Sequence, residues 1–181
     1  MNKRLFMVLL GCRPEGRNTE QHDVFFGVAS SLEDLIPEMN AFWPHVELHI
    51  DAYLIVEVVD GYEIVITPQK RKENPLENNP KLYFINLGGY SPPDFEEFHK
   101  KILVVAEDMS SAIKQVKDDV FYLAGQNQNT SARSHIDDKM EVDSIIPVQE
   151  LILDYRIEVR KAETEPSQTK LHIGYLSLSK I

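Results

Sequence analysis

The sequence predicts an α+β fold of two tandem β-β-α-β units with added hairpins, a mixed sheet with helices on one face, and an internal pseudo-twofold. Three observations predict it: a repeat within the chain, short apolar runs of strand length, and two apolar stripes with helical spacing. The predicted domains are a first repeat unit with a hairpin at residues 1–68, a linker at 69–80, and a second repeat unit with a C-terminal hairpin at 81–181.

The repeat relates residues 5–39 to residues 82–116 at an offset of 77. Random pairing over this length gives about two identities, because average composition sets a match rate of roughly 6%. The identical pairs are Leu5/Leu82, Leu10/Leu87, Gly11/Gly88, Glu20/Glu97, His22/His99, Val28/Val105, Ala29/Ala106 and Ile36/Ile113. We interpret the repeat as a tandem duplication whose two copies fold in the same way.

The first copy opens with two strands. Residues 5–10 form a continuous apolar run closed by Gly11, which is typical of a strand buried on both faces. Residues 11–19 contain proline, glycine and asparagine and predict a loop, and residues 24–29 predict a second buried strand.

A helix is expected next in the first copy, because four apolar residues follow with the i, i+3, i+4, i+7 spacing of one helical face. These residues are Leu32, Leu35, Ile36 and Met39. Ser30 and Glu33 fit a capping box at its start. Pro37 removes a backbone donor, so we expect a kink or a short helix.

A tight hairpin is predicted around Asp60-Gly61, which separates two β-rich runs at residues 49–59 and 62–67. The segment 68–80 is rich in proline and in asparagine and glutamine, and it predicts the connection between the copies.

The second copy repeats this order. Strands are expected at residues 82–87 and 102–106, with a loop at 88–94 between them, followed by a helix from Met109 that Asp108 caps. A short helix or turn is expected within residues 145–154, and residues 155–161 and 171–178 predict a closing hairpin. A strand-helix-strand passage leaves its two strands parallel, so the predicted sheet is mixed.

Composition excludes some classes of partner and predicts a compartment. The net charge of −10 opposes nucleic acid, since that binding depends on clustered lysine and arginine. No apolar run approaches the ~20 residues of a membrane span. The single cysteine, Cys12, allows no intramolecular disulfide and predicts a cytoplasmic protein. A basic start followed by residues 5–12 resembles a lipoprotein signal, but its apolar run is shorter than the roughly 7 to 15 residues of a signal and recurs inside the chain.

Several segments resemble a known family. LFMVLLG at 5–11, EQHDVFFG at 20–27, the strand around His99 and SHIDDK at 134–139 are similar to a bacterial family classed as domain of unknown function 1543, whose small domain occurs singly or in tandem. The resemblance covers roughly residues 4 to 140. It implies a soluble bacterial protein and brings no assigned activity, so no catalytic residue is carried over.

Histidine and acidic residues recur in pairs two positions apart in both copies. Alternate residues of a strand face one side, so each pair would present an imidazole and a carboxylate together, as metal binding or acid-base chemistry requires. The plainer interpretation is that the histidines are hydrogen-bonded residues at strand starts. The pairs are Glu20 with His22, Glu97 with His99, His49 with Asp51, and His135 with Asp137 and Asp138.

A second candidate is the loop at residues 11–17, where Arg13 and Arg17 with two glycines could hold an anion. Solvated loop charges are the plainer interpretation. The second copy lacks both arginines, which counts against a shared anion site.

We therefore expect a ligand- or protein-binding module, with a metal-assisted hydrolase that uses the repeated histidine and acid pairs as the alternative. Convergence of those side chains on one point would favour the hydrolase, and scattered histidines would favour the binding module. The sequence requires no cofactor and leaves its identity unknown. Expected partners are a small molecule, a protein or a second copy of the chain, and neither nucleic acid nor a membrane.

Overall fold

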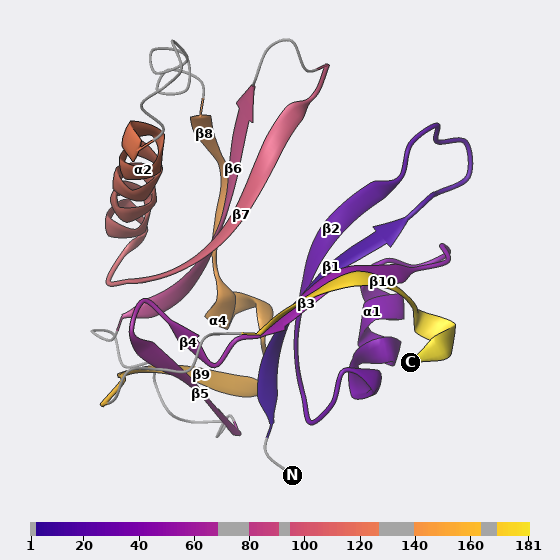
Figure 1. The fold of residues 1–181 in the computed structure, drawn as a ribbon. Helices are drawn as coiled ribbons and strands as arrows, with labels where there is room; N and C mark the ends of the chain where they lie inside the picture. The colour runs from indigo at the N-terminus through magenta and orange to yellow at the C-terminus, as the bar shows by residue number, and fades with distance from the viewer. Residues whose placement is uncertain (1–2, 69–79, 91–94, 127–139, 164–169) are drawn as a thin grey trace. The chain divides into compact units, whose positions relative to one another are not determined.

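A computed structural model describes residues 3–68, 80–90, 95–126, 140–163 and 170–181 of the protein (Figure 1). The chain divides into two compact units, which we call unit 1 (Met1–Arg71 and Leu151–Ile181) and unit 2 (Lys72–Glu150). Mostly antiparallel sheets with few helices make a small α+β fold, as predicted. The predicted linker at 69–80 lies almost wholly outside the described residues. No helix in the described part of the chain is long and apolar enough to span a membrane.

The described part of unit 1 contains two sheets and the short helix α1. A four-stranded sheet has the order β10-β3-β1-β2, and a three-stranded sheet has the order β4-β5-β9. Its elements are β1 (Arg4–Cys12), β2 (Gln21–Ala29), η1 (Glu33–Leu35), α1 (Ile36–Phe42), β3 (His49–Ile55), β4 (Val58–Val59), β5 (Tyr62–Pro68), β9 (Tyr155–Lys161), β10 (Leu171–Ser177) and η2 (Leu178–Lys180).

The core of unit 1 lies between α1 and one face of the four-stranded sheet. Alternate residues of β1 from Phe6 to Cys12 enter this core, together with Leu35 and Met39 from the helical segment. Both helical residues are completely buried. The other face of β1, which includes Gly11, is therefore turned away from the helix.

Unit 2 has a three-stranded sheet with the order β7-β6-β8 and a longer helix, α2, which runs beside it (Figure 1). The elements are β6 (Lys81–Tyr90), β7 (Glu97–Ala106), α2 (Met109–Gln126) and β8 (Met140–Pro147), and α4 (Val148–Leu151) follows at the end of the unit. Ala112 and Val116 of α2 pack on Tyr83, Ile85 and Val104 of the sheet. The predicted strands and helix of this copy are confirmed, although β6 runs on through the two glycines of the predicted loop.

The two helix starts differ from each other. Asp108 caps α2 as predicted, since its Oδ1 accepts a hydrogen bond of 2.7 Å from the Ser111 N–H. The capping box of the first copy is wrong, because the Ser31 N–H instead donates to Asp34 Oδ2 at 3.2 Å. A 3₁₀ turn therefore precedes α1, and Pro37 stands in the first turn of the α-helix, where a missing N–H leaves no bond unmade.

The prediction of a mixed sheet is wrong, because every strand pairing in the described part of the chain is antiparallel. The crossover through α1 does leave β2 and β3 pointing in the same direction, as the rule for such passages predicts. However, β1 lies between them and is antiparallel to both.

The predicted C-terminal hairpin is also wrong. β9 pairs with β5 and β10 pairs with β3, so residues 151–181 complete unit 1, although the sequence assigns them to the second repeat unit. A sequence shows which segments favour strand structure. Distant partners become visible only in the folded chain.

The tight turn at Asp60-Gly61 is confirmed, with Val59 paired to Tyr62 and positive φ angles of 52° and 77° at the two turn residues. The strand before it is shorter than predicted. β3 ends at Ile55 because the chain bends there, and the buried Val56 donates its N–H to the Leu5 carbonyl oxygen at 2.8 Å.

Candidate metal centre

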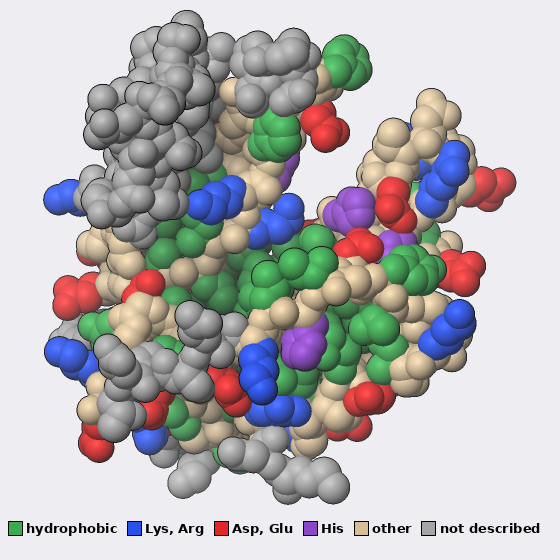
Figure 2. All heavy atoms as spheres, viewed as in Figure 1, with side chains coloured by type: hydrophobic (Ala, Val, Ile, Leu, Met, Phe, Trp, Pro, Cys, Tyr) green, Lys and Arg blue, Asp and Glu red, His purple; other side chains and the backbone are tan. Residues whose placement is uncertain are grey.

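A row of three residues crosses the end of the unit 1 sheet. Gly11 of β1 pairs with His22 of β2 on one side and with His49 of β3 on the other. Paired residues of neighbouring strands point to the same face, so both imidazoles lie on the side of the sheet opposite α1. Figure 2 shows histidine and acidic side chains side by side at the surface of unit 1.

A β-bulge adds Asp51 to this row. Leu10 pairs with Ile50 and Leu9 pairs with Ala52, which leaves Asp51 without a partner on β1. Bulges re-aim side chains, and this one brings the carboxylate over Gly11. Glu20 stands two residues before His22 and supplies a second carboxylate.

The four side chains form a closed ring in which imidazoles alternate with carboxylates. Around this ring, His22 Nε2 lies 3.7 Å from Glu20 Oε2 and 3.1 Å from Asp51 Oδ2. His49 Nε2 lies 3.0 Å from Glu20 Oε1 and 3.4 Å from Asp51 Oδ1. Tetrahedral ligands at about 2.0–2.1 Å from Zn²⁺ are roughly 3.3 Å apart, so the sides of the ring already have the spacing of ligands on one ion.

Gly11 is required for this ring. A Cβ atom there would lie 2.3 Å from His49 Nε2 and 2.6 Å from Asp51 Oδ2. Real Cβ atoms essentially never approach other atoms so closely. Gly11 thus leaves the space that the ring occupies.

His49 is buried and incompletely bonded. The residue is 7% exposed, and the ring of Tyr175 from β10 packs on its imidazole with 4.6 Å between centroids. Its Nε2 and the Asp51 Oδ2 are buried atoms without a hydrogen-bond partner. The Nε2 atom lies 3.0 Å from Glu20 Oε1 and 3.4 Å from Asp51 Oδ1, but it forms a hydrogen bond with neither of these oxygens.

Unit 2 has the same kind of row on its own sheet. Gly88 of β6 pairs with His99 of β7 and with Glu141 of β8. Asn86 pairs with Ser144 and Leu87 with Val142, so Asp143 is the bulge residue here.

The acids and the imidazole of unit 2 also converge. His99 Nδ1 lies 3.3 Å from Asp143 Oδ2, and His99 Nε2 lies 3.8 Å from Glu97 Oε2. Donor atoms of these three residues all lie within 4.8 Å of one another. A Cβ atom on Gly88 would lie 2.5 Å from both an Asp143 and a Glu97 carboxylate oxygen, so a side chain there would displace these carboxylates from their positions.

The two clusters differ in how closed they are. Among the described residues, the set with all donors within 4.8 Å is that of unit 2. In unit 1 the short distances are those between an imidazole and a neighbouring carboxylate. To bind one cation, the two imidazoles must also approach each other, and so must the two carboxylates. The side chains of Glu20 and His22 are 47% and 40% exposed, so they have the freedom to rotate inward.

Most of the predicted site residues are brought together within their own units. Glu20, His22, His49 and Asp51 form the unit 1 ring, and Glu97 and His99 belong to the unit 2 cluster. Of the other predicted residues, His135, Asp137 and Asp138 lie outside the described residues, and Arg13 and Arg17 lie in the exposed loop between β1 and β2.

Asp143 and Asn86 were missed by reasoning from the sequence. The sequence drew attention to His135 and Asp137 instead, because His-Ile-Asp at residues 135–137 repeats residues 49–51. The true counterpart is residues 141–143, where Glu replaces His. The sequence feature that could have identified Asp143 is the mostly apolar run after it, because residues 144–147 follow Asp143 as residues 52–55 follow Asp51.

The arginine loop makes its contacts within itself. Arg13 Nε donates to the Arg17 carbonyl oxygen at 3.4 Å, and the Arg17 N–H donates to the Pro14 carbonyl oxygen at 3.2 Å. Both side chains are exposed, and the anion site stays a prediction. Burial raises the pKa of the adjacent Cys12 thiol, and the charge of Glu20 raises it further, which keeps this residue protonated and unreactive.

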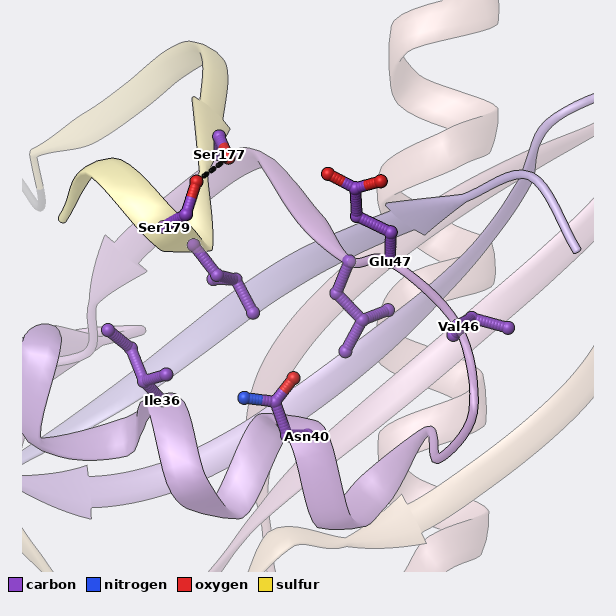
Figure 3. A pocket seen from close by; sticks show the side chains of 8 residues that line it. Ile36, Asn40, Val46, Glu47, Ser177 and Ser179 are labelled. Atoms are coloured by element: carbon purple, nitrogen blue, oxygen red, sulfur yellow. Dashed lines mark hydrogen bonds between the residues drawn. The ribbon is translucent and has the colours of Figure 1, made fainter.

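A hollow of about 380 Å³ lies elsewhere in unit 1, between α1, the segment before β3 and the end of β10 (Figure 3). Its lining includes Ile36, Leu48 and Leu178, and one wall carries a 2.8 Å hydrogen bond between Ser177 and Ser179. Among the described residues that line it, only Glu47 is charged. This hollow therefore lacks a set of converging charged or metal-binding side chains among its described lining residues.

Comparisons with known proteins agree with the fold. The family described as Domain of Unknown Function (DUF1543) matches residues 17–66, a segment that contains all four residues of the unit 1 ring. Among solved structures, the crystal structure of a protein Il1583 from Idiomarina loihiensis is similar, with 28% identity, a TM-score of 0.63 and 98% of each chain covered. A search of curated proteins finds no match.

Proposed function

We propose that this chain is a divalent-metal-binding protein, and that the ring of Glu20, His22, His49 and Asp51 in unit 1 is its metal site. Two imidazole nitrogens and two carboxylates are a donor set that Zn²⁺ and similar ions use in proteins. The observation that carries the proposal is the Nε2 atom of His49, which is buried and has no hydrogen-bond partner.

An unpartnered buried polar atom is unfavourable by about 1–3 kcal/mol. A bound cation would remove this cost, because neutral imidazole nitrogen is a metal ligand. The same cation would neutralise two carboxylates that share one small site. Nothing else in the described surroundings of His49 supplies a partner for its Nε2 with acceptable geometry.

A protonated ring is the competing explanation. Two imidazolium groups and two carboxylates would balance in charge, and the ring would then be a network of ion pairs that are partly exposed at Glu20, His22 and Asp51 and buried at His49. Solvent-exposed ion pairs contribute about 0–1 kcal/mol each to stability. They also give no reason for a glycine at the same position of each sheet. Direct metal titration separates the two explanations.

The test is calorimetric titration of Zn²⁺ into chelator-treated protein. We expect His49→Ala to bind one equivalent less than the wild type, because the variant lacks the buried ligand. The matched control is His45→Asn, which removes an exposed histidine of the same unit at φ 67°, a conformation that asparagine tolerates. Equal stoichiometry in wild type and His49→Ala would refute the proposal.

We further propose that the two units arose by tandem duplication of one small domain. The glycine-centred row, the bulge acid and the strand order of β2-β1-β3 recur as β7-β6-β8, and this supports the repeat found in the sequence. An experimental structure in which residues 5–39 and 82–116 fail to superimpose would contradict it.

Metal-assisted hydrolysis is the second candidate function, since histidines and acids converge in each unit. A bound metal lowers the pKa of coordinated water and generates a nucleophile at neutral pH. The test is hydrolysis of nitrophenyl esters and phosphate esters by the zinc-loaded protein. Rates equal to those of free Zn²⁺ would leave binding as the function.

A further inference from the structure

Unit 2 presents a cluster that is richer in oxygen donors than the ring of unit 1. Its donors are one imidazole, from His99, and two carboxylates, from Glu97 and Asp143. Glu141 takes the place that His49 has in unit 1, so an acid replaces the second histidine. The side chains of all three donors are 32–39% exposed, which leaves one side of the cluster open to water.

We propose that Glu97, His99 and Asp143 bind a second divalent cation, of the oxygen-preferring class of Mn²⁺, with water completing its coordination. The idea that such clusters take cations rests on the proposed function. The selectivity and the open coordination are new, and they follow from the donors of unit 2 alone.

The donor count decides the kind of ion. Carboxylate, amide and water oxygens suit Mn²⁺ and Mg²⁺, whereas sites rich in imidazole suit Zn²⁺. Three protein donors leave about half of an octahedral shell for water or for an oxygen atom of an anionic ligand. A closed shell of four protein donors, as unit 1 would provide, leaves no such position to a tetrahedral ion.

Asn86 is an independent observation that points to the same place. Its Nδ2 donates to Asp143 Oδ2 at 3.3 Å and lies 3.3 Å from His99 Nδ1. Its Oδ1 is a buried atom without a hydrogen-bond partner. In unit 1 the residue at the same register position is Leu9. Unit 2 therefore has a polar side chain at a position where unit 1 has an apolar one. The amide nitrogen thus joins two of the proposed ligands, Asp143 and His99, and the amide oxygen is a buried acceptor left without a partner beside them.

The region around the cluster is also strongly negative. The Tyr90 hydroxyl donates a hydrogen bond of 3.3 Å to Glu97 Oε2, and Glu141 of β8 pairs with Gly88 in the same row as His99. A dication placed among these groups would be attracted by three carboxylates rather than two. This supports a cation and opposes an anion as the direct occupant.

The site is also shaped by the backbone. Gly88 leaves the space that the Asp143 and Glu97 carboxylates occupy, and the bulge between Asn86 and Leu87 turns Asp143 to the same face as His99. Ordinary surface acids need neither feature.

The experiment is titration of Mn²⁺ into chelator-treated full-length protein, with loss of the electron paramagnetic resonance signal of free Mn²⁺ as the measure of binding. We expect Asp143→Asn to bind one Mn²⁺ less than the wild type, or to bind it at least tenfold more weakly. His49→Ala should retain this Mn²⁺. The matched control is Glu96→Gln, which removes an exposed acid that directly precedes Glu97 and lies just before β7.

The outcomes separate the two proposals. Loss of one zinc equivalent in His49→Ala, with Mn²⁺ binding unchanged by Asp143→Asn, overturns the second site and leaves the unit 1 site standing. Absence of Mn²⁺ binding to a protein that binds Zn²⁺ does the same. Absence of binding by either metal overturns both. Circular dichroism of Asp143→Asn verifies its fold, and asparagine is close in shape to the native aspartate, so a folded variant without Mn²⁺ supports the proposal.

Discussion

His49 Nε2 lies 3.0 Å from Glu20 Oε1, yet this nitrogen is a buried atom without a hydrogen-bond partner. His49 belongs to β3 and Glu20 directly precedes β2, and Gly11 of β1, the strand between them, leaves the space that the His49 side chain occupies. A buried atom near a charge of the right sign without a bond to it indicates that a third group belongs there. This relationship is the basis of the metal proposal.

Replacing the glycines tests whether space over the sheet is what the clusters need. Gly11→Ala should abolish zinc binding in unit 1, because the new Cβ would overlap His49 Nε2. The crowding should also lower the free energy of unfolding by about 1–3 kcal/mol. Gly88→Ala is the reciprocal control, and it should remove the Mn²⁺ equivalent while zinc binding is kept. Intact zinc affinity in Gly11→Ala, measured by calorimetry, would contradict the prediction.

Zinc should stabilise the folded protein, since the unfolded chain has no assembled ring. A ligand at 100 times its Kd stabilises by about 2.7 kcal/mol, and thermal unfolding followed by circular dichroism would report this as a higher Tm. His49→Ala should lose most of the rise, whereas His45→Asn should keep it. Equal increases in both variants would show that zinc acts somewhere else.

Asp108 should make the stability of α2 dependent on pH in the acidic range. The N–H group of Ser111, which donates to its carboxylate, lowers the pKa of Asp108 in the folded state. The stability that this cap contributes is fully present above the pKa of Asp108 in the unfolded chain. It is lost as the pH falls through the lower pKa of Asp108 in the folded protein. Asp108→Ala should therefore lower the Tm at neutral pH, and Asp108→Asn, which still caps, should lower it less. Thermal unfolding of both variants at neutral and acidic pH measures the difference. A Tm unchanged in Asp108→Ala would rule out the cap.

Cys12 should resist labelling until the protein unfolds. Its side chain is completely buried, and burial, aided by the charge of Glu20, raises the pKa of its thiol. Stability associated with this group is present below the unfolded pKa and is lost as the pH rises through the folded pKa. Reaction with a thiol reagent at mildly alkaline pH should thus be slow in the native protein and fast in denaturant. Rapid native labelling would show that the β1 end opens.

The turn at Asp60-Gly61 should be sensitive to its glycine. Gly61 has a φ of 77°, which costs other residues roughly 1–2 kcal/mol. Gly61→Ala should lower the free energy of unfolding by about that amount, whereas Asp60→Asn should be close to neutral, because asparagine suits this turn. Urea denaturation measures both. A neutral Gly61→Ala would mean that the hairpin does not form part of the cooperative fold.

Much of the local structure could be read from the chain itself, because it depends on neighbours in sequence. The apolar run at residues 5–10 predicted β1, and Asp108 predicted the start of α2. The His22 and His99 pairs with their acids were visible because two-residue spacing and the 77-residue repeat are both patterns of sequence.

The bulges were beyond such reasoning. Asp51 and Asp143 each stand between two core residues that are three positions apart, Ile50 and Tyr53 in one case and Val142 and Ile145 in the other. A regular strand has a period of two, so only a bulge lets both core residues face inward. The repeated sequence His-Ile-Asp pointed to Asp137 as the acid that matches Asp51. The pairing of β6 with β8 shows instead that Asp143 is the bulge residue of unit 2.

The sequence by itself determined that strands, two helices and repeated histidine and acid pairs exist, since periodicity and local turn chemistry act over a few residues. Tertiary structure alone decided which strands pair, that residues 151–181 complete unit 1, and that Gly11 and Gly88 make room for the clusters. The physical reason is that strand pairing joins residues far apart in the chain. Its register, including every bulge, is set by the packing of the whole sheet on its core.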